Sequence, residues 1–389
     1  SLDHEYARWA ERECPMNAPA DTPRFAFVME QTLGHVTHYR NMRSTIEAET
    51  LVNATWLPLG FPLHGGIETL PGLRENWSIR ASLRARRLLA RRHAASTYQA
   101  LYFHTQVTAL LSTGLMCRVP TVVSLDATPI NYDCVGSGYG HRASGRLAEG
   151  VKLAINRRPL LAARALITWC DWARRSLIDD YGVSAERITV IPPGVPLTQW
   201  PAPRVRPDTG PLRILFVGAD FARKGGEDLL LAATQLPRPV ELHLVTKVDI
   251  PERPGVKVYR DLAPNSDLLK RLYAEADLFV LPTRADCFPL VVQEAMAAGL
   301  PVIATNVGAI GEVVIPDRTG LLVPSGNPQA LASAIGALDN DRSRRTAMGQ
   351  EARQLAERRF DSAANARRIL DLMHGMVAEC RREPAARDG

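Results

Sequence analysis

The chain has 389 residues, of which 46% are hydrophobic, and its 47 basic and 41 acidic residues give a formal net charge of +6. This length exceeds the ~250–300 residues at which a single core stops growing, so we expect two domains. The small basic excess is too dilute to indicate nucleic-acid binding, and it suits anionic small molecules or an anionic membrane surface. The six cysteines lack metal-ligand spacing and indicate free thiols in a reducing compartment.

The start of the chain differs in character from the rest of the sequence. Residues 1–23 are polar and interrupted by prolines, and we expect them to form a flexible extension. No apolar run in the chain approaches the ~20 residues that span a membrane, and no secretory signal is visible. We therefore expect a cytoplasmic protein.

Predicted strands alternate with helical segments in the first half of the chain. This alternation predicts a parallel, doubly wound sheet, and so an α/β domain over residues 24–195. Residues 196–211 are rich in proline, which suits neither a helix nor a central strand, and we expect an interdomain linker there. The predicted strands are residues 24–30, 50–59, 100–105, 120–126, 165–170 and 188–192.

Several polar residues follow the predicted strands of this first domain. In "MEQTLGHVTHYRNM" the chain passes from a strand into a helix through Gly34, and His35 and His38 flank the helix start. We interpret these two histidines as surface or capping residues. His104 ends the strand "ALYFHT" at the expected edge of a cleft, and it is either a catalytic group or a structural one.

Asp126 ends the strand of "TVVSLDATP", where side chains of parallel α/β sheets face ligands. We predict that it has a functional role in the cleft. The alternative is that it caps the following turn. Residues 131–146 are interpreted either as a mobile loop over the cleft, with Tyr139, His141 and Arg142 as contacts, or as a disordered insertion.

The segment "SIRASLRARRLLARRHA", residues 78–94, contains six arginines and no acidic residue. A helix there places Arg80, Arg84, Arg87 and Arg91 on one face. Such a helix is either a solvated surface or a peripheral contact with anionic lipid, which would place the protein at the inner face of the membrane.

The alternation of strands and helices restarts after the linker and predicts a second α/β domain over residues 212–361. Two such domains joined by a proline-rich segment suggest a cleft between them, with ligands beyond the carboxyl ends of the strands. The last predicted helix, residues 362–383, is expected to pack back on the first domain.

The stretch "FVGADFARKGGEDLL" passes from a strand to a helix through Arg223 and Lys224. Free amides at a helix start, beside two cations, suit a diphosphate. The stretch matches neither the P-loop nor the dinucleotide-binding pattern, which argues against a dehydrogenase. The alternative is a solvated surface turn.

Asp286 and Glu294, with seven residues between them, frame an apolar turn in "TRADCFPLVVQEAMAAG". A carboxylate near a helix start accepts hydrogen bonds from both hydroxyls of a ribose. The amides of Phe288 and Leu290, with that of Cys287, are candidate donors to sugar hydroxyls or phosphate. In the alternative interpretation, Glu294 is a satisfied polar residue on a helix rim and Asp286 is a helix cap.

Together, "FVGADFARKGGEDLLLAA" and "AEADLFVLPTRADCFPLVVQEAMAAGLPVIATNVGAIGEVVIPDRTGLLVPSGNPQALASAI" resemble the carboxy-terminal domain of glycosyltransferase family 4, over residues 212–340. The resemblance implies the GT-B fold, with two Rossmann-like domains and a cleft between them. It also implies transfer of a sugar from a nucleotide sugar with retention of anomeric configuration and without a bound metal. By the same resemblance, Glu294 holds the ribose, Asp286 lies near the donor sugar and Lys224 binds phosphate.

The chain departs from the family pattern at several of these positions. The arginine usual after the strand glycine is Ala219 here, and Arg223 is a candidate replacement. The first acid is usually Glu rather than Asp286. A glycine pair that lets amides approach the diphosphate is reduced to Gly34. Asp126 occupies the position of a histidine near the reacting carbon, and the resemblance implies that it binds a donor hydroxyl, or orients or deprotonates the acceptor. By the same resemblance, the loop over residues 131–146 covers the acceptor site.

The sequence therefore predicts a retaining hexosyltransferase that uses a UDP- or GDP-linked sugar, with a glycan or a lipid-linked acceptor, in synthesis of the bacterial cell envelope. Base contacts are expected near Tyr259 and Arg260. No cofactor or metal besides the nucleotide-sugar co-substrate is expected, and no nucleic acid. Two alternatives stay open: a nucleotide-sugar epimerase of the same fold, and a non-catalytic nucleotide-sugar-binding subunit.

Overall fold

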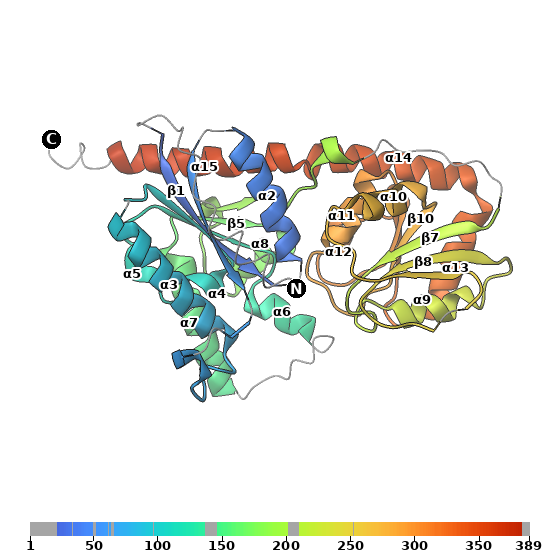
Figure 1. The fold of residues 1–389 in the computed structure, drawn as a ribbon, viewed down its shortest axis with the longest axis horizontal. Helices are drawn as coiled ribbons and strands as arrows, with labels where there is room; N and C mark the ends of the chain where they lie inside the picture. The colour runs from blue at the N-terminus through green and yellow to red at the C-terminus, as the bar shows by residue number, and fades with distance from the viewer. Residues whose placement is uncertain are drawn as a thin grey trace.

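A computed structural model describes most of the chain, and Figure 1 shows its two domains side by side. The predicted extension over residues 1–23 lies almost wholly outside the described residues, as do most of the segment 131–146 and most of the linker 196–211. The described residues are 22–32, 34–49, 52–60, 62–63, 66–95, 97–136, 146–200, 210–251 and 253–382.

The first domain is built on a six-stranded parallel sheet with the order β2-β1-β3-β4-β5-β6. Its central strands are buried along their whole length, as expected for a parallel sheet covered on both faces. The strands are β1 (Arg24–Gln31), β2 (Asn53–Gly60), β3 (Ala100–His104), β4 (Thr121–Leu125), β5 (Ala165–Thr168) and β6 (Ile188–Val190).

Helices cover both faces of this sheet, and short helical turns join the strands. The elements are α2 (His35–Glu49), η1 (Gly66–Thr69), α3 (Trp77–Ala95), α4 (Gln106–Ala109), α5 (Thr113–Met116), α6 (Pro129–Cys134), α7 (Arg146–Ala162), α8 (Asp171–Asp179), η3 (Ala185–Arg187) and η4 (Leu197–Gln199).

The second domain has its own six-stranded parallel sheet, with the order β12-β11-β10-β7-β8-β9. Its strands are β7 (Leu212–Val217), β8 (Val240–Val245), β9 (Val256–Tyr259), β10 (Leu278–Leu281), β11 (Val302–Thr305) and β12 (Gly320–Val323). Its helices are α9 (Gly226–Ala233), α10 (Asp267–Glu275), α11 (Leu290–Ala297), α12 (Ile310–Val313), α13 (Pro328–Asn340) and α14 (Arg342–Arg359).

The last helix, α15 (Ser362–Arg382), returns to the first domain and lies beside α2 (Figure 1). Its apolar side chains, from Ala366 to Val377, join the buried core on that face of the first sheet. Two backbone hydrogen bonds hold the chain at the start of α15 against Val195 of the first domain. Val195 N–H donates to Phe360 O at 2.7 Å, and Ser362 N–H donates to Val195 O at 3.1 Å. The two passages of chain between the domains therefore meet at one place.

The carboxyl ends of the strands in the two sheets point toward each other (Figure 1). Apolar residues pack across the domain boundary there: Ala127 and Val135 of the first domain form one buried cluster with Ala285 and Cys287 of the second. Trp169 also meets Phe288, with ring centroids 6.0 Å apart. The two-domain α/β fold predicted from the sequence is confirmed.

The arginine face predicted for residues 78–94 is wrong at two of its four positions. Arg80 and Arg84 are buried, and Arg84 is held by Glu68 and by the carbonyl oxygens of Gly60 and Pro62, each 2.6 Å from a guanidinium nitrogen. A helical projection alone does not reveal Gly60, Pro62 and Glu68, which contact this side of α3. The exposed arginines of α3 are Arg86, Arg87, Arg91 and Arg92.

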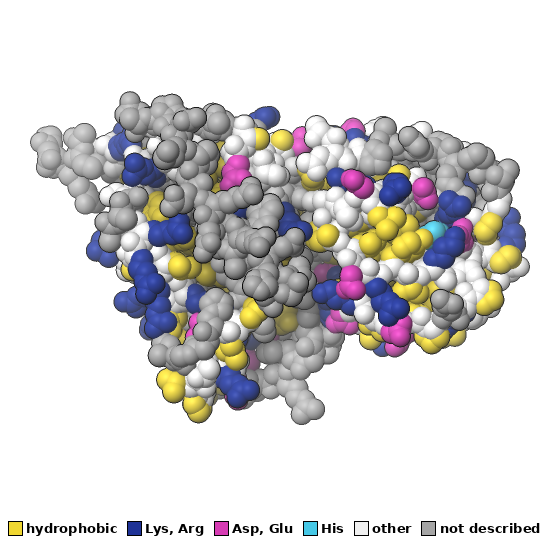
Figure 2. Space-filling view, viewed as in Figure 1, with side chains coloured by type: hydrophobic (Ala, Val, Ile, Leu, Met, Phe, Trp, Pro, Cys, Tyr) yellow, Lys and Arg dark blue, Asp and Glu magenta, His cyan; other side chains and the backbone are white. Residues whose placement is uncertain are grey.

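Lys and Arg side chains gather over α3 on the surface in Figure 2. Within the described residues, no helix is both long enough and apolar enough to cross a membrane.

Candidate active site

The turn between β7 and α9 carries the two cations that the sequence singled out. Gly225 precedes α9 in a left-handed conformation with φ 77°, and a Cβ there would lie 1.9 Å from the carbonyl oxygen of Pro282. Only glycine fits this position, because a side chain would meet both a strained backbone and the end of β10. The turn is thereby pressed against the loop that contains Asp286.

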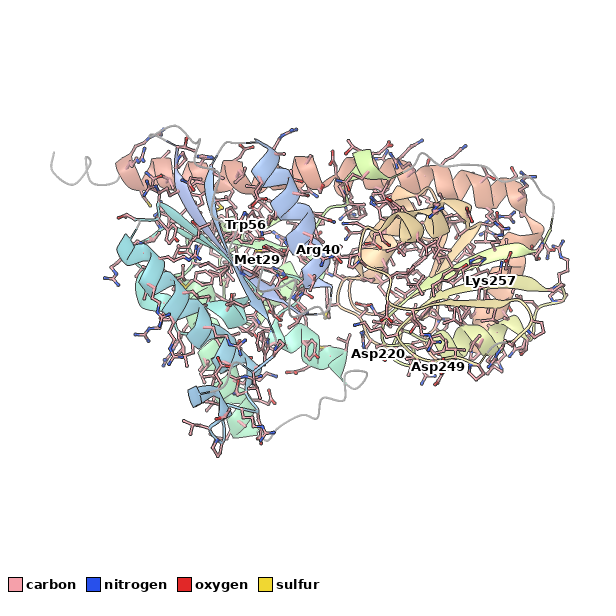
Figure 3. The ribbon with its side chains drawn as sticks, in the orientation of Figure 1. Met29, Arg40, Trp56, Asp220, Asp249 and Lys257 are labelled. Atoms are coloured by element: carbon pink, nitrogen blue, oxygen red, sulfur yellow. The ribbon has the colours of Figure 1, made fainter. Side chains whose placement is uncertain are left out.

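Lys224 and Arg223 both reach that loop. The ammonium group of Lys224 forms an ion pair with Asp286, and both side chains are largely buried. Arg223 donates from Nη1 to Ala285 O at 2.7 Å and from Nε to Asp220 Oδ2 at 3.1 Å. Figure 3 shows Asp220 at the lower edge of the second domain, on the loop that follows β7. Two cations are thus fixed at the start of α9, which is an arrangement that stabilises an anionic group.

Glu294 lies within α11, in the helix predicted for it, and its side chain is buried. Tyr273, on α10, donates its hydroxyl to Glu294 Oε2 at 2.9 Å. Burial raises the pKa of Glu294 to about 7, although the hydrogen bond from Tyr273 opposes that rise. Sequence reasoning missed Tyr273, because its position reads as an ordinary buried aromatic of an amphipathic helix.

Gly34 lies at the start of α2, close to the second domain. A Cβ built on Gly34 would have Leu290 Cδ1 as its nearest neighbour, at 3.6 Å. Leu290 is the first residue of α11, so the starts of two helices from different domains meet here. Gly34, Leu290 and the Lys224–Asp286 pair all lie beyond the carboxyl ends of their sheets, which is where this class of fold binds ligands.

Asp126 directly follows β4, and its side chain keeps 20% of its surface exposed. It does not cap the following turn, because Thr128 caps α6 through a reciprocal pair of hydrogen bonds with Asn131. Its Oδ2 atom instead lies 3.5 Å from Nε2 of His35. The structure thus argues against the capping alternative for Asp126 and gives it a histidine neighbour that sequence reasoning did not foresee.

His104, predicted as a catalytic residue, lies behind an aromatic ring, and a catalytic role for it stays a prediction. Its side chain is fully buried and stacks on Trp169, with ring centroids 5.1 Å apart and planes 11° apart. His38 is buried beside the same tryptophan, so its interpretation as a surface or capping residue is wrong, whereas the side chain of His35 keeps 14% of its surface exposed. The strand end does face the second domain, but Trp169 covers it.

Tyr259 and Arg260, the candidates for base contacts, lie at the end of β9, the edge strand. The Tyr259 hydroxyl lies 3.0 Å from His243 Nδ1, so its side chain lies along the sheet rather than beyond its end. Arg260 is exposed and pairs with Asp249 at 2.9 Å. No described contact joins either side chain to the Lys224–Asp286 pair, and a base contact through them stays a prediction.

Within the described residues, no group of three or more His, Cys, Asp or Glu side chains is arranged to hold a metal ion. A cavity of ≈ 730 Å³ lies at the amino ends of β7–β9, lined by Val240, Glu241 and Lys257 among others. A second cavity, of ≈ 410 Å³, lies between the β3–β4 side of the first domain and α15. Neither cavity is lined by Lys224, Asp286, Glu294 or Asp126, whose chemistry places the candidate site at the domain boundary.

Two Rossmann-like domains with facing strand ends, and cations held at a helix start between them, define the GT-B class. A family model described as "Glycosyl transferase 4-like domain" matches residues 30–194, and one described as "Glycosyl transferases group 1" matches residues 211–341. The two matches account for both domains. The chain belongs to the family-4 type of glycosyltransferase with the GT-B fold, as its sequence motifs suggested.

Among curated relatives, a D-inositol 3-phosphate glycosyltransferase from Xylanimonas cellulosilytica is 32% identical over 59% of this chain. The alignment spans 61% of that relative's length. Among solved structures, sucrose-phosphate synthase from Thermosynechococcus elongatus superposes with a TM-score of 0.72 and 21% identity, over 92% of this chain and 100% of that one. HepE from Anabaena, solved with UDP and glucose, has a TM-score of 0.66 and 18% identity, over 91% of this chain and 100% of that one.

Proposed function

We propose that this protein is a retaining glycosyltransferase that moves a hexose from a UDP- or GDP-linked donor to the hydroxyl of a glycan or lipid-linked acceptor. The observation that carries the proposal is the pair of fixed cations, Arg223 and Lys224, at the start of α9, which contact the loop of Ala285 and Asp286. A nucleoside diphosphate leaving as an anion needs positive charge at that point.

In this proposal the second domain binds the donor. Glu294 accepts hydrogen bonds from the ribose hydroxyls, Asp286 lies near the sugar, and the amides of Phe288 and Leu290 donate to the donor. As the bond between the anomeric carbon and the diphosphate oxygen breaks, the electron pair leaves with the diphosphate. Arg223, Lys224 and the amides near Gly34 stabilise the charge that develops. The acceptor approaches from the first domain, where Asp126 is exposed.

Cation placement supports transfer without a divalent metal, because two fixed side-chain charges act on the departing diphosphate. One neighbour of the same fold was solved with UDP, which supports the donor class, and one relative is named for glycosyl transfer to an inositol phosphate, which supports a hydroxyl acceptor. We place the reaction in bacterial cell-envelope synthesis on the cytoplasmic side, with contact to the inner face of the membrane through α3.

Release of nucleoside diphosphate tests this proposal. Purified protein is incubated with UDP- and GDP-hexoses and a panel of glycan and lipid acceptors, with and without EDTA. We expect acceptor-dependent release of UDP or GDP, unchanged by EDTA, and a glycosidic product with the anomeric configuration of the donor. Inverted product configuration, or loss of turnover with EDTA, contradicts the corresponding part of the proposal.

Lys224→Ala should lower kcat at least ~100-fold, because the diphosphate loses a charge-stabilising contact. Lys270→Ala, on the surface of α10, is the matched control and should keep wild-type turnover. Equal rates in the two variants would remove Lys224 from the site. A new free nucleotide sugar formed from donor alone would indicate an epimerase, whereas binding without any turnover would indicate a non-catalytic subunit.

A further inference from the structure

His35 faces two carboxylates at the inner end of the first sheet, and the proposed function so far gives it no role. Its Nε2 atom lies 3.5 Å from Asp126 Oδ2, and its Nδ1 atom lies 3.8 Å from Glu30 Oε1. The strand register explains the meeting: Met29, His104 and Ser124 lie side by side across β1, β3 and β4. The residues that come just after these three, among them Glu30 and Asp126, therefore lie close together.

The imidazole of His35 is held in this orientation. The rings of His104 and Trp169 meet it edge-on, with centroids 4.5 Å and 5.6 Å away. Glu30 is fixed in turn, since its two carboxylate oxygens accept hydrogen bonds from Thr32 at 2.5 Å and Thr105 at 2.6 Å. Glu30 lies beside Nδ1 of His35, and the rings of His104 and Trp169 pack against its imidazole. The other ring nitrogen, Nε2, therefore faces Asp126.

The charges around His35 favour its protonated form. Burial lowers the pKa of His35, but Asp126 and Glu30 more than offset this effect, and its pKa lies above the usual 6.5. The other titratable groups packed around it, His38 and His104, have lowered pKa values because they are buried and lie beside His35. The positive charge of this histidine cluster is thus concentrated on the residue that faces Asp126.

We propose that His35 is a positioning residue for the transfer reaction, which fixes the Asp126 carboxylate against the acceptor hydroxyl. The proposal rests on the function proposed above. The acceptor oxygen forms its bond to the anomeric carbon while the bond to the diphosphate breaks. An oxygen so bonded is far more acidic than a free alcohol, so its proton passes to Asp126 and then to solvent. The protonated imidazole holds the carboxylate in place throughout.

The test compares His35→Gln with wild type in pH profiles of kcat. Glutamine keeps a neutral N–H donor but has no charge to lose. In the wild type, kcat should fall on the alkaline side as His35 deprotonates. In His35→Gln, kcat should drop roughly 10- to 100-fold and the alkaline limb should vanish, while UDP affinity stays within about twofold. His93→Gln, on α3, is the matched control and should behave as wild type. An unchanged kcat with the same alkaline limb in His35→Gln overturns the proposal.

A second measurement does not depend on turnover or on that variant folding. Histidine ring signals in isotope-labelled protein are titrated by NMR, in the wild type and in Asp126→Asn. Because Asp126 is partly exposed, this variant should fold, and the pKa of His35 should fall when its carboxylate partner is lost. An unchanged pKa refutes the pairing. Absence of any donor-dependent turnover in the wild type would instead refute the proposed function, with the NMR result still standing.

Discussion

The carboxyl group of Glu294 is buried beside the Tyr273 hydroxyl, and its protonation state makes the candidate site sensitive to pH. Burial raises its pKa to about 7, so the free protein holds this carboxyl protonated below neutral pH. A carboxylate accepts hydrogen bonds from two ribose hydroxyls, whereas a protonated carboxyl uses one oxygen as a donor. In our proposal, nucleotide binding therefore requires Glu294 to lose a proton.

We expect the affinity for UDP or GDP to weaken as pH falls below about 7, by up to tenfold per pH unit. The sign follows from the raised pKa: at low pH, part of the binding free energy is spent on deprotonating Glu294. Isothermal titration calorimetry between about pH 8 and about pH 5.5 measures this dependence. A 2′,3′-dideoxy nucleotide is the matched control, because it titrates like the natural nucleotide but offers no ribose diol. Identical pH dependence for both ligands would contradict the role of Glu294.

The sequence singles out the candidate donor-site residues, but it does not reveal which side chains contact them. Lys224 and Asp286 each lie on a loop that follows a predicted strand, and Glu294 lies inside the predicted helix after Asp286, so their spacing singles them out while their roles in donor binding stay predictions. The same spacing does not assign Tyr273 or His35 to the site. Their partners lie on separate elements, and only strand register and helix packing bring them together.

At the scale of elements, the arginines exposed on α3 differ from those that a helical projection of the sequence places on one exposed face. The buried arginines of α3 make contacts inside the first domain, whereas its exposed arginines have no acidic residue beside them on the helix.

The central strands are predicted well, because a strand buried on both faces gives a continuous apolar run. The four-residue helices α4 and α5 are not predicted individually, since one turn carries no periodic pattern.

The exposed face of α3 gives a prediction about membrane contact. The double variant Arg87→Ala, Arg91→Ala should bind vesicles containing anionic lipid more than tenfold more weakly than wild type, since each arginine contributes about 1 kcal/mol near such a surface. Binding should also weaken with added salt. Vesicle co-sedimentation measures both effects. The double variant Arg271→Ala, Arg358→Ala, in exposed positions of the second domain, is the control, and equal loss in both variants would refute a specific role for α3.

At the scale of the whole molecule, the two domains are joined by polar contacts as well as by the apolar cluster at their boundary. The backbone N–H groups of Asp171 and Trp172, which open α8, donate to the two carboxylate oxygens of Glu312, each at 2.7 Å. Cys170, the N-cap residue of α8, makes no side-chain cap. A helix of the first domain is thus capped by a carboxylate of the second, which also favours the positive end of the helix.

This arrangement predicts that Glu312 controls how firmly the domains close on each other. Glu312→Ala removes the cap and should cost about 1 kcal/mol of domain contact, which shifts the molecule toward a more open arrangement. Small-angle X-ray scattering should show a larger radius of gyration, and hydrogen exchange at the Asp171 and Trp172 amides should accelerate. Glu351→Ala, which removes an ion pair with Arg318 inside the second domain, should change neither quantity. Because UDP or GDP would bridge the same boundary, saturating nucleotide should restore the compact form of Glu312→Ala. Unchanged exchange at both amides would show that Glu312 does not hold the domains together.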